Sequence, residues 1–270
     1  MTVCIFHANC ADGFGAAWVV RKALGEIDFH GAKYQEPPPD VTGKDVVMVD
    51  FSYKRPVLLE MAEKANSILI LDHHKTSAED LVDLPTNVTA KFDMNRSGAM
   101  LTWEHFFPGE TPPPLLLHIE DRDLWRFALQ NTRQIQANVF SFPYDFQVWD
   151  TLMATAAAAL ATEGEAIERK HFKDIRELLG VTTREMVIGG HRVPVANLPY
   201  TMSSDAGHEM AKGRPFAACY WDTPEGRVFS LRSNDEGIDV SEVAKQYGGG
   251  GHRNASGFRV SFAQAQAFEV

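Results

Sequence analysis

The most constraining feature of the chain is a run of four aliphatic residues, 68–71, that leads directly into Asp72, His73 and His74. Such a run is too short for an ordinary helix and contains no polar residue, so it predicts a strand buried on both faces. Open α/β sheets place their ligands at the carboxyl ends of such strands. An acid followed by two imidazoles there indicates a metal site, and the structural alternative is a satisfied histidine beside an Asp72 helix cap.

Two earlier strands are predicted to end in residues of the same kind. The β-type run 2–6 is followed by His7 and then by Asp12 at the start of a helical segment, and the apolar run 46–49 ends at Asp50. Because helices separate the strands, right-handed crossovers make them parallel and align their carboxyl ends. We therefore expect these three side chains to converge with the Asp-His-His segment, although Asp12 taken alone has an alternative role as a helix cap.

A fourth acidic position follows the three prolines 112–114. Residues 115–125 are predicted to form a helix in which acids follow apolar residues. Helical spacing from Leu117 places Asp121 on the same face, and Asp123 is the nearby competitor. We expect Asp121 to join the cluster.

Two further segments are candidates for binding an anion. Residues 93–100 have a turn-then-helix pattern in which Arg96, Ser97 and backbone amides suit an anion, and the alternative is a simple capped helix. The glycine-rich segment 248–257 allows concave arrays of N–H groups that suit phosphate or a terminal carboxylate. A flexible linker is the alternative, but polar residues and a new strand follow the glycines. The residues expected to bind here are Arg232, Gly249, Gly250, Gly251, His252 and Asn254.

Length and composition predict a two-domain α/β protein. The chain has 270 residues, more than one domain usually holds. We expect a metal-binding domain at 1–150, a helical linker at 151–183 and a smaller, β-rich substrate-binding domain at 184–270. The three cysteines lack paired metal spacing, which argues against a disulfide framework and a structural zinc site.

The charge balance limits the partners that the sequence predicts. The formal net charge is −10, which disfavours wrapping long duplex DNA through a broad basic surface but is compatible with a small phosphate-bearing substrate. The sequence shows no long apolar run and no basic-then-apolar leader, so we expect no membrane span and a cytoplasmic location. A homodimer is allowed by these features but is not required by them.

Taken together, these motifs resemble the DHH phosphoesterase family, in the branch that carries a C-terminal DHH-associated domain. The resemblance covers nearly the whole chain: the opening motif 7–13, an isolated strand-end Asp50, the Asp72-His73-His74 signature, the acid at Asp121 and the glycine-rich segment. It implies a parallel-sheet domain and a smaller mixed-sheet domain on either side of a cleft. It also implies two divalent ions, usually Mn²⁺ with Mg²⁺ as the alternative.

The resemblance assigns roles to matching positions. It implies that Asp50 bridges the two ions and that His74 touches the scissile phosphate. The metal ligands that it implies are His7, Asp12, Asp50, His73 and Asp121. Arg232, His252 and the amides of Gly249–Gly251 correspond to the clamp for the rest of the nucleotide.

One position departs from the family pattern. The opening motif commonly carries two acids, and here Asn9, Cys10 and Ala11 stand where the first acid would fall. Asn9, Cys10 or water would complete one metal position, and a Cys10 ligand would favour ions softer than Mn²⁺.

Three activities are consistent with this site. The first is hydrolysis of short linear oligonucleotides or dinucleotides to mononucleotides, which a compact second domain and an acidic charge favour. The second is removal of phosphate from 3′-phosphoadenosine 5′-phosphate or opening of cyclic dinucleotides. The third, motivated by the missing acid, is an inactive nucleotide sensor.

Overall fold

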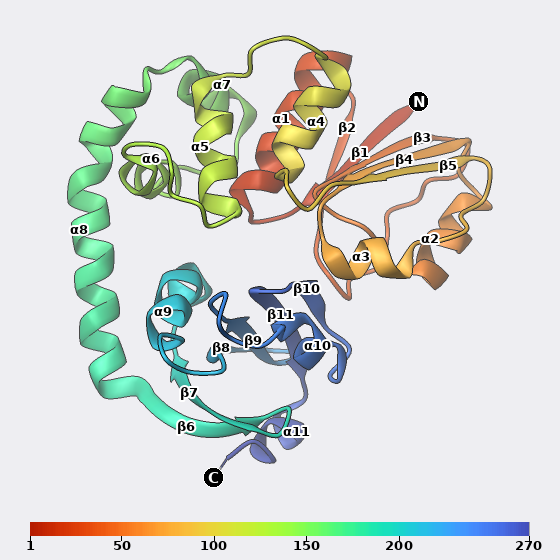
Figure 1. Ribbon diagram of the computed structural model, residues 1–270. Helices are drawn as coiled ribbons and strands as arrows, with labels where there is room; N and C mark the ends of the chain where they lie inside the picture. Colours follow the sequence, from red (N-terminus) through yellow and green to blue (C-terminus); the bar gives the residue numbers. More distant parts are fainter. Residues whose placement is uncertain (270) are drawn as a thin grey trace. The chain divides into compact units, whose positions relative to one another are not determined.

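The computed structural model describes residues 1–269, and these form two compact units. The first unit is Met1–Glu168 and the second begins at Arg169 (Figure 1). The first is built on a parallel sheet and the second on a mixed sheet, each with packed helices, so the predicted α/β class is confirmed. Within the described residues, none of the helices combines the length and apolar character needed to cross a membrane.

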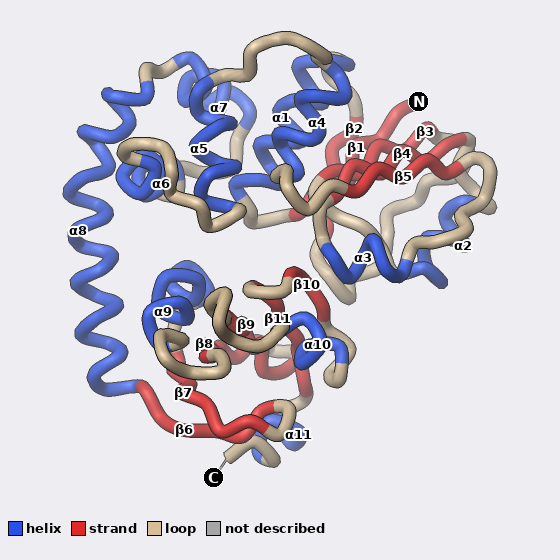
Figure 2. The backbone as a smooth tube through the Cα atoms, in the orientation of Figure 1, coloured by secondary structure: helices blue, strands red, loops and turns tan. Residues whose placement is uncertain are grey.

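The sheet of the first unit is five-stranded and entirely parallel, in the order β2-β1-β3-β4-β5 (Figure 2). Its strands are β1 (Thr2–His7), β2 (Asp28–Ala32), β3 (Asp45–Val49), β4 (Ser67–Asp72) and β5 (Val88–Phe92). The chain runs outward from β1 to β2 and then in the other direction from β3 to β5. The strand order therefore reverses between β1 and β3, and such a switch point is where ligands bind in open α/β sheets.

Alternating residues of these strands fill two separate cores. Cys4, Val47 and Leu71 contribute to one core, whereas their strand neighbours Met48 and Ile70 contribute to the other. The first core is covered by α1 (Ala11–Leu24), α4 (Gly98–Phe106) and α5 (Pro114–Asp123). The second is covered by α2 (Arg55–Ala62), beside which α3 (Lys75–Asp80) lies on the same side of the sheet (Figure 1).

Three more helices pack beyond α5. They are α6 (Thr132–Val139), α7 (Phe146–Ala154) and α8 (Ala157–Thr182). Leu160 and Ala161 of α8 are buried in the first core, and Gly164 of the same helix lies against the backbone of Gln134 in α6. The absence of a side chain at Gly164 therefore sets how closely α8 approaches α6.

The second unit contains a six-stranded sheet in the order β10-β11-β9-β8-β7-β6, in which only β7 and β8 are parallel. Its strands are β6 (Thr183–Ile188), β7 (His191–Asn197), β8 (Ala217–Thr223), β9 (Gly226–Arg232), β10 (Gly250–His252) and β11 (Ala255–Val260). Its helices are the short 3₁₀ turn η1 (Tyr200–Met202), α9 (Ser203–Met210), α10 (Val240–Lys245) and α11 (Phe262–Gln266). One face packs against α10 and α11, and the other against α9 and the second half of α8.

Replacing Gly164 by alanine should destabilise the first unit. A Cβ atom at this position would lie 1.8 Å from the carbonyl oxygen of Gln134, so α8 must move away from α6. Gly180 is the matched control because its Cβ would meet nothing within 4 Å. We expect Gly164→Ala to lower the free energy of unfolding by about 1–3 kcal/mol in urea melts. Gly180→Ala should be neutral or stabilising, and equal melting curves for the two variants would contradict this packing.

Candidate metal centre

Asp50 lies at the centre of the site. It follows β3 directly and has a left-handed backbone with φ of 53°, which aspartate adopts more readily than most residues. Its side chain is 1% exposed. Oδ1 lies 3.0 Å from His73 Nε2, and Oδ2 lies 3.5 Å from His7 Nδ1. Among residues 1–269, the buried Oδ2 atom makes no hydrogen bond.

His73 brings three carboxylates together. It is buried at the end of β4, and its Nε2 atom lies 3.0 Å from Asp50, 3.5 Å from Asp123 and 3.6 Å from Asp12. The acids come from the end of β3, the end of α5 and the first turn of α1. The convergence predicted for the strand-end acids is therefore present in the structure.

Asp12 connects the cluster to a helix other than its own. Its carboxylate accepts hydrogen bonds from the backbone amides of Gly98 at 2.5 Å and Ala99 at 3.0 Å, the first two residues of α4. A helix N-terminus favours negative charge, so α4 stabilises this buried carboxylate. Gly98 also packs closely on Asp50, because a Cβ atom there would lie 2.4 Å from the Cβ atom of Asp50.

Two groups of three potential ligands share Asp50. One group is His7, Asp50 and His74, and the other is Asp12, Asp50 and His73; in each, the ligand atoms lie within 4.8 Å of one another. One oxygen of Asp50 faces each group, since Oδ1 is beside His73 and Oδ2 is nearest His7. This is the arrangement that a carboxylate bridging two cations would need.

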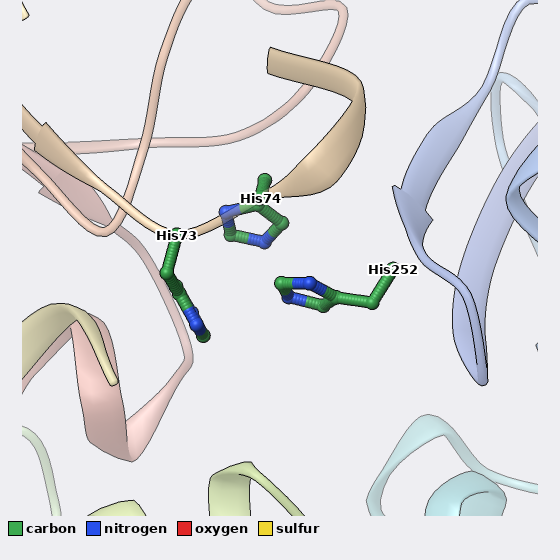
Figure 3. Close-up of side chains that lie close together, drawn as sticks. All are labelled: His73, His74 and His252. Atoms are coloured by element: carbon green, nitrogen blue, oxygen red, sulfur yellow. The ribbon is translucent and has the colours of Figure 1, made fainter. Parts of the chain in front are cut away.

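His74 is oriented by the acid that precedes the histidine pair. Asp72 Oδ1 lies 2.7 Å from His74 Nδ1, and Asp72 also accepts hydrogen bonds from the His73 amide at 2.8 Å and Ser52 Oγ at 2.7 Å. Figure 3 shows the two histidine rings on the turn after β4, with centroids 5.0 Å apart. Asp72 therefore fixes the orientation of the His74 ring through its Nδ1 atom.

The charges of the cluster alter its pKa values in opposite directions. Burial, reinforced by the charges of Asp50 and Asp123, raises the pKa of Asp12 well above its ordinary value. Burial alone would also raise the pKa of Asp50, but the imidazoles of His7 and His73 beside its two oxygens outweigh it and lower the pKa. Burial opposes charging of His73, yet its hydrogen bond to Asp50 and the charges of Asp123, Asp50 and Asp12 raise the pKa of His73 well above its usual range. The acids around His73 therefore favour its imidazolium form over the neutral ring.

These residues fit a pair of divalent cations. The buried Asp50 Oδ2 atom is a carboxylate oxygen, which can bind a cation, and it makes no hydrogen bond among residues 1–269. The negative charges of the neighbouring acids also repel one another. A set that mixes carboxylate and imidazole suits Mn²⁺ better than Mg²⁺, which prefers oxygen ligands and water. Cation binding would displace the proton of His73, because only the neutral imidazole is a ligand.

The predicted position of one acid needs correction. Asp121 lies outside the cluster: its carboxylate accepts hydrogen bonds from the amides of Ala128 at 2.8 Å and Leu129 at 3.1 Å and from Thr132 Oγ1 at 2.5 Å. Asp123, which competed with it in the sequence, is the acid that approaches His73. Asp121 thus shapes the loop that follows α5 instead of facing the cations.

The helix phase explains this difference. Leu117, from which the face was counted, is 38% exposed, whereas Leu116 and Ile119 both pack against Gly15 of α1. Asp123 follows these two residues at spacings of seven and four, so it lies on the face of α5 that packs against α1. Counting from the residues that contact α1 would have selected Asp123.

Arg96 and Ser97 make the contacts expected of a simple capped helix, which was the alternative to anion binding. Arg96 forms ion pairs with Glu104 at 2.7 Å and with Glu120 at 3.2 Å. Ser97 is fully buried as the N-cap of α4, where its hydroxyl accepts a hydrogen bond from the Met100 amide. Both polar groups are engaged within the first unit, so we do not retain them as anion-binding residues.

The predicted substrate-binding residues of the second unit lie around one hairpin. Arg232 ends β9 and donates hydrogen bonds to Ser204 and Ser230. Asn254 lies in the turn between β10 and β11 and donates a hydrogen bond to Asp235. Gly250, Gly251 and His252 form β10.

Gly249 differs from the expectation for the glycine segment. Its N–H donates to the carbonyl of Ala244, so it is not available to an anion. A Cβ atom at Gly249 would lie 2.1 Å from the carbonyl oxygen of Gly257. Close approach of two backbones explains this glycine.

One residue near the cluster, Tyr34, was not predicted as a site residue. Its ring contacts those of His7 at 5.4 Å and His74 at 5.9 Å between centroids. Cys10, one of the candidates for completing a metal position, is the N-cap residue of α1, where burial, followed by the charges of Asp50 and Asp123, raises the pKa of its thiol well above the ordinary value. Cys10 is therefore kept protonated in the metal-free protein. Tyr34 lies in a loop whose sequence carries no metal-ligand pattern.

Comparison with curated proteins identifies one relative by sequence. The chain is 32% identical over 285 aligned positions to the uncharacterized protein R106 of Acanthamoeba polyphaga mimivirus, with 96% of this chain and 67% of the relative covered. No protein-family model matches the chain.

Solved structures with a similar fold include RecJ from Thermus thermophilus in complex with Mn²⁺. The match has a TM-score of 0.54 and 15% sequence identity, and it covers 99% of this chain but only 50% of RecJ. The pGpG-specific phosphodiesterase PggH from Vibrio cholerae aligns with a TM-score of 0.48 and 14% identity, covering 98% of this chain and 95% of that chain.

The parallel sheet with its Asp-His-His strand end, followed by a mixed-sheet unit, has the fold of RecJ. By sequence, the chain belongs to the same family as R106 of mimivirus.

Substitution of the two neighbouring acids should separate metal binding from loop stability. We expect Asp123→Asn to weaken Mn²⁺ binding at least about tenfold in calorimetric titrations, since it removes a carboxylate 3.5 Å from His73. Asp121→Asn should leave Mn²⁺ affinity nearly unchanged but lower the melting temperature, because its oxygens accept bonds from the loop amides. The reverse pattern would restore Asp121 as the metal ligand.

Acid sensitivity should reveal the role of Asp72. Burial opposes its ionisation, but the charge and hydrogen bond of His74 lower the pKa of Asp72 from 3.8 to about 2. A lowered folded-state pKa stabilises the fold above about pH 4, and that contribution is lost as the pH falls through about 2. It amounts to roughly 2 kcal/mol. Denaturant melts between about pH 5 and pH 2 should therefore show a steeper loss of stability for the wild type than for Asp72→Asn, and parallel curves would contradict this assignment.

Proposed function

We propose that the protein is a metal-dependent phosphodiesterase that hydrolyses short linear oligonucleotides or dinucleotides to mononucleotides with two divalent ions, Mn²⁺ in preference to Mg²⁺. The observation that supports this proposal best is the sharing of Asp50 by two groups of three ligands. A structural ion pair would need one partner for Asp50, whereas two histidines and a second acid surround it. Its fully buried, unbonded Oδ2 atom is costly unless a cation meets it.

Each proposed ligand would lie on one side of the shared Asp50 carboxylate. His7 would hold one ion, Asp12 and His73 would hold the other, and Asp50 would contact both. Asp123 takes the place that we first assigned to Asp121. When bound, two cations lower the pKa of a water molecule and stabilise the negative charge of the phosphoryl oxygens during in-line displacement.

Side chains of the first unit would position the hydrogen-bond donor that contacts the phosphate. Asp72 and Ser52 fix the His74 ring, and burial that opposes its charge is outweighed by Asp72, so the pKa of His74 is raised. A protonated His74 would donate a hydrogen bond to a phosphate oxygen and favour the build-up of charge there. A reaction of this kind needs no side-chain nucleophile.

The charge of the chain favours short substrates. A net charge of −10 is unsuited to long duplexes, which bind by neutralising many phosphates. Arg232 and the hairpin residues Gly250, Gly251 and His252 are the proposed groups that hold the rest of the nucleotide, in the substrate-binding role predicted for residues 184–270. Their polar and glycine-rich character suits a terminal phosphate.

Removing the shared carboxylate should abolish hydrolysis. We expect Asp50→Ala to reduce Mn²⁺-dependent turnover of a dinucleotide by at least about 10³-fold, because both ion positions lose a ligand. Asp28→Ala is the matched control, since Asp28 is an exposed residue of β2 whose ion pair with Lys44 is 3.9 Å long. Full turnover by Asp50→Ala would refute the proposed site.

A substrate panel separates the activities that share such a centre. Linear dinucleotides, single strands of increasing length, cyclic dinucleotides and 3′-phosphoadenosine 5′-phosphate would be compared at equal Mn²⁺ concentration. The proposal expects the highest kcat/KM for linear dinucleotides and very short strands, with none after chelation. Preference for the bisphosphate would favour the phosphatase activity. Nucleotide binding without turnover under any metal would identify a sensor.

A further inference from the structure

The loop after α5 carries an exposed cluster of rings and guanidinium groups that the proposed chemistry does not use. It consists of Trp125, Phe127, Phe140, Arg122 and Arg133, and we call it the ring–guanidinium platform. Phe140 is 48% exposed, and Trp125 and Phe127 are partly exposed. The loop joins α5 to α6, which pack side by side (Figure 1). These side chains lie at the surface of the first unit, outside its buried cores.

The two arginines lie against the rings. The guanidinium carbon of Arg133 is 3.6 Å from the centroid of the Phe127 ring and 5.7 Å from that of Trp125. Arg122 lies 5.3 Å from Trp125 and 5.1 Å from Phe140. The planes of Trp125 and Phe127 are at 80° with centroids 4.9 Å apart. Flat apolar surfaces and positive charge are therefore interleaved in one patch.

The backbone that presents these rings is unusual. Trp125 has φ of 55° and Phe127 has φ of 48°, in the left-handed region that bulky side chains rarely adopt. Asp121 holds the loop in this form: its carbonyl accepts hydrogen bonds from the amides of Arg126 at 2.8 Å and Phe127 at 3.2 Å. Its carboxylate binds the amides of residues 128 and 129. Strained conformations that their surroundings enforce in this way concentrate at functional sites.

The platform flanks an acid of the metal centre, because Arg122 precedes Asp123 and Trp125 follows it by two residues. Asp123 Oδ2 lies 3.5 Å from His73 Nε2, and two residues of extended chain span at most about 7 Å. The backbone of Trp125 is therefore at most about 7 Å from the backbone of a cluster acid. One segment supplies both a cluster acid and the rings.

We propose that the ring–guanidinium platform stacks unpaired bases of the substrate next to the scissile phosphate. In proteins that bind single-stranded nucleic acids, bases stack on aromatic rings and positively charged side chains contact the phosphate backbone. An apolar peptide would match the rings but not the positive charge of the patch, whereas a nucleotide supplies both a base and a phosphate. This inference deepens the proposed function and rests on it: it assigns the recognition of bases to the first unit.

The test compares substrates with and without a base. The variants Trp125→Leu and Phe127→Leu keep apolar volume but remove a ring, and Phe142→Leu is the matched control because Phe142 is an exposed aromatic, 37%, in the loop between α6 and α7 and outside the platform. We expect the first two variants to raise KM for a dinucleotide about 5- to 100-fold. Turnover of methyl p-nitrophenyl phosphate, a diester without bases, should stay within about twofold, and Phe142→Leu should change neither activity.

A second readout does not depend on turnover. Binding of a trinucleotide that contains 2-aminopurine, measured by fluorescence in chelator, should weaken by the same factor in Trp125→Leu and Phe127→Leu and remain unchanged in Phe142→Leu. Thermal melts verify that each variant is folded. Unchanged trinucleotide binding in both platform variants would overturn the inference, and so would an equal loss of activity on both substrates, which would show that the loop only positions Asp123.

The outcomes distinguish this inference from the proposed function. If the wild type hydrolyses neither diester with Mn²⁺, the proposed function fails, while the fluorescence measurement still decides whether the platform binds bases. If the wild type hydrolyses both and the platform variants match it on both substrates, the platform inference alone fails. Self-association of the wild type that Trp125→Leu abolishes, with unchanged trinucleotide binding, would assign the patch to a second copy of the chain and overturn base stacking.

Discussion

The carboxylate of Asp50 is the group on which the arrangement of the site depends. It lies next to the point where the strand order reverses, so strands β1, β3 and β4 all contribute to its surroundings. The amide of Asp50 donates to the carbonyl of Leu71, which fixes the register of the two strand ends. With that register, His7 and His73 lie on either side of the carboxylate. A shift of one residue in the strand register would turn the side chains to the opposite face of the sheet and separate these residues.

Much of the centre could be predicted from the sequence because its residues follow strands. Parallel strands with crossovers bring their carboxyl ends to one edge, so His7, Asp12, Asp50 and His73 could be grouped without any side-chain geometry. The α/β class follows from the same hydrophobic patterns. The two-domain assignment of roles remains a prediction.

Details that depend on tertiary packing could not be obtained this way. The choice between Asp121 and Asp123 depends on which leucine of α5 is buried, and periodicity over ten residues leaves that phase open. The use of the Gly249 amide depends on a contact with Ala244 across a turn. The left-handed conformation of Trp125 accompanies hydrogen bonds from the following amides to Asp121 in the last turn of α5, for which the sequence has no local signal.

The hydrogen bonds between Asp12 and the start of α4 have a consequence for the charge balance of the fold. Asp12 and Asp50 are almost fully buried, and the partly exposed Asp123 lies beside the same histidine, so like charges are crowded in one place. The partial positive charge of the α4 terminus and the imidazole of His73 offset part of that repulsion. The polypeptide itself therefore supplies part of the counter-charge that its buried acids require.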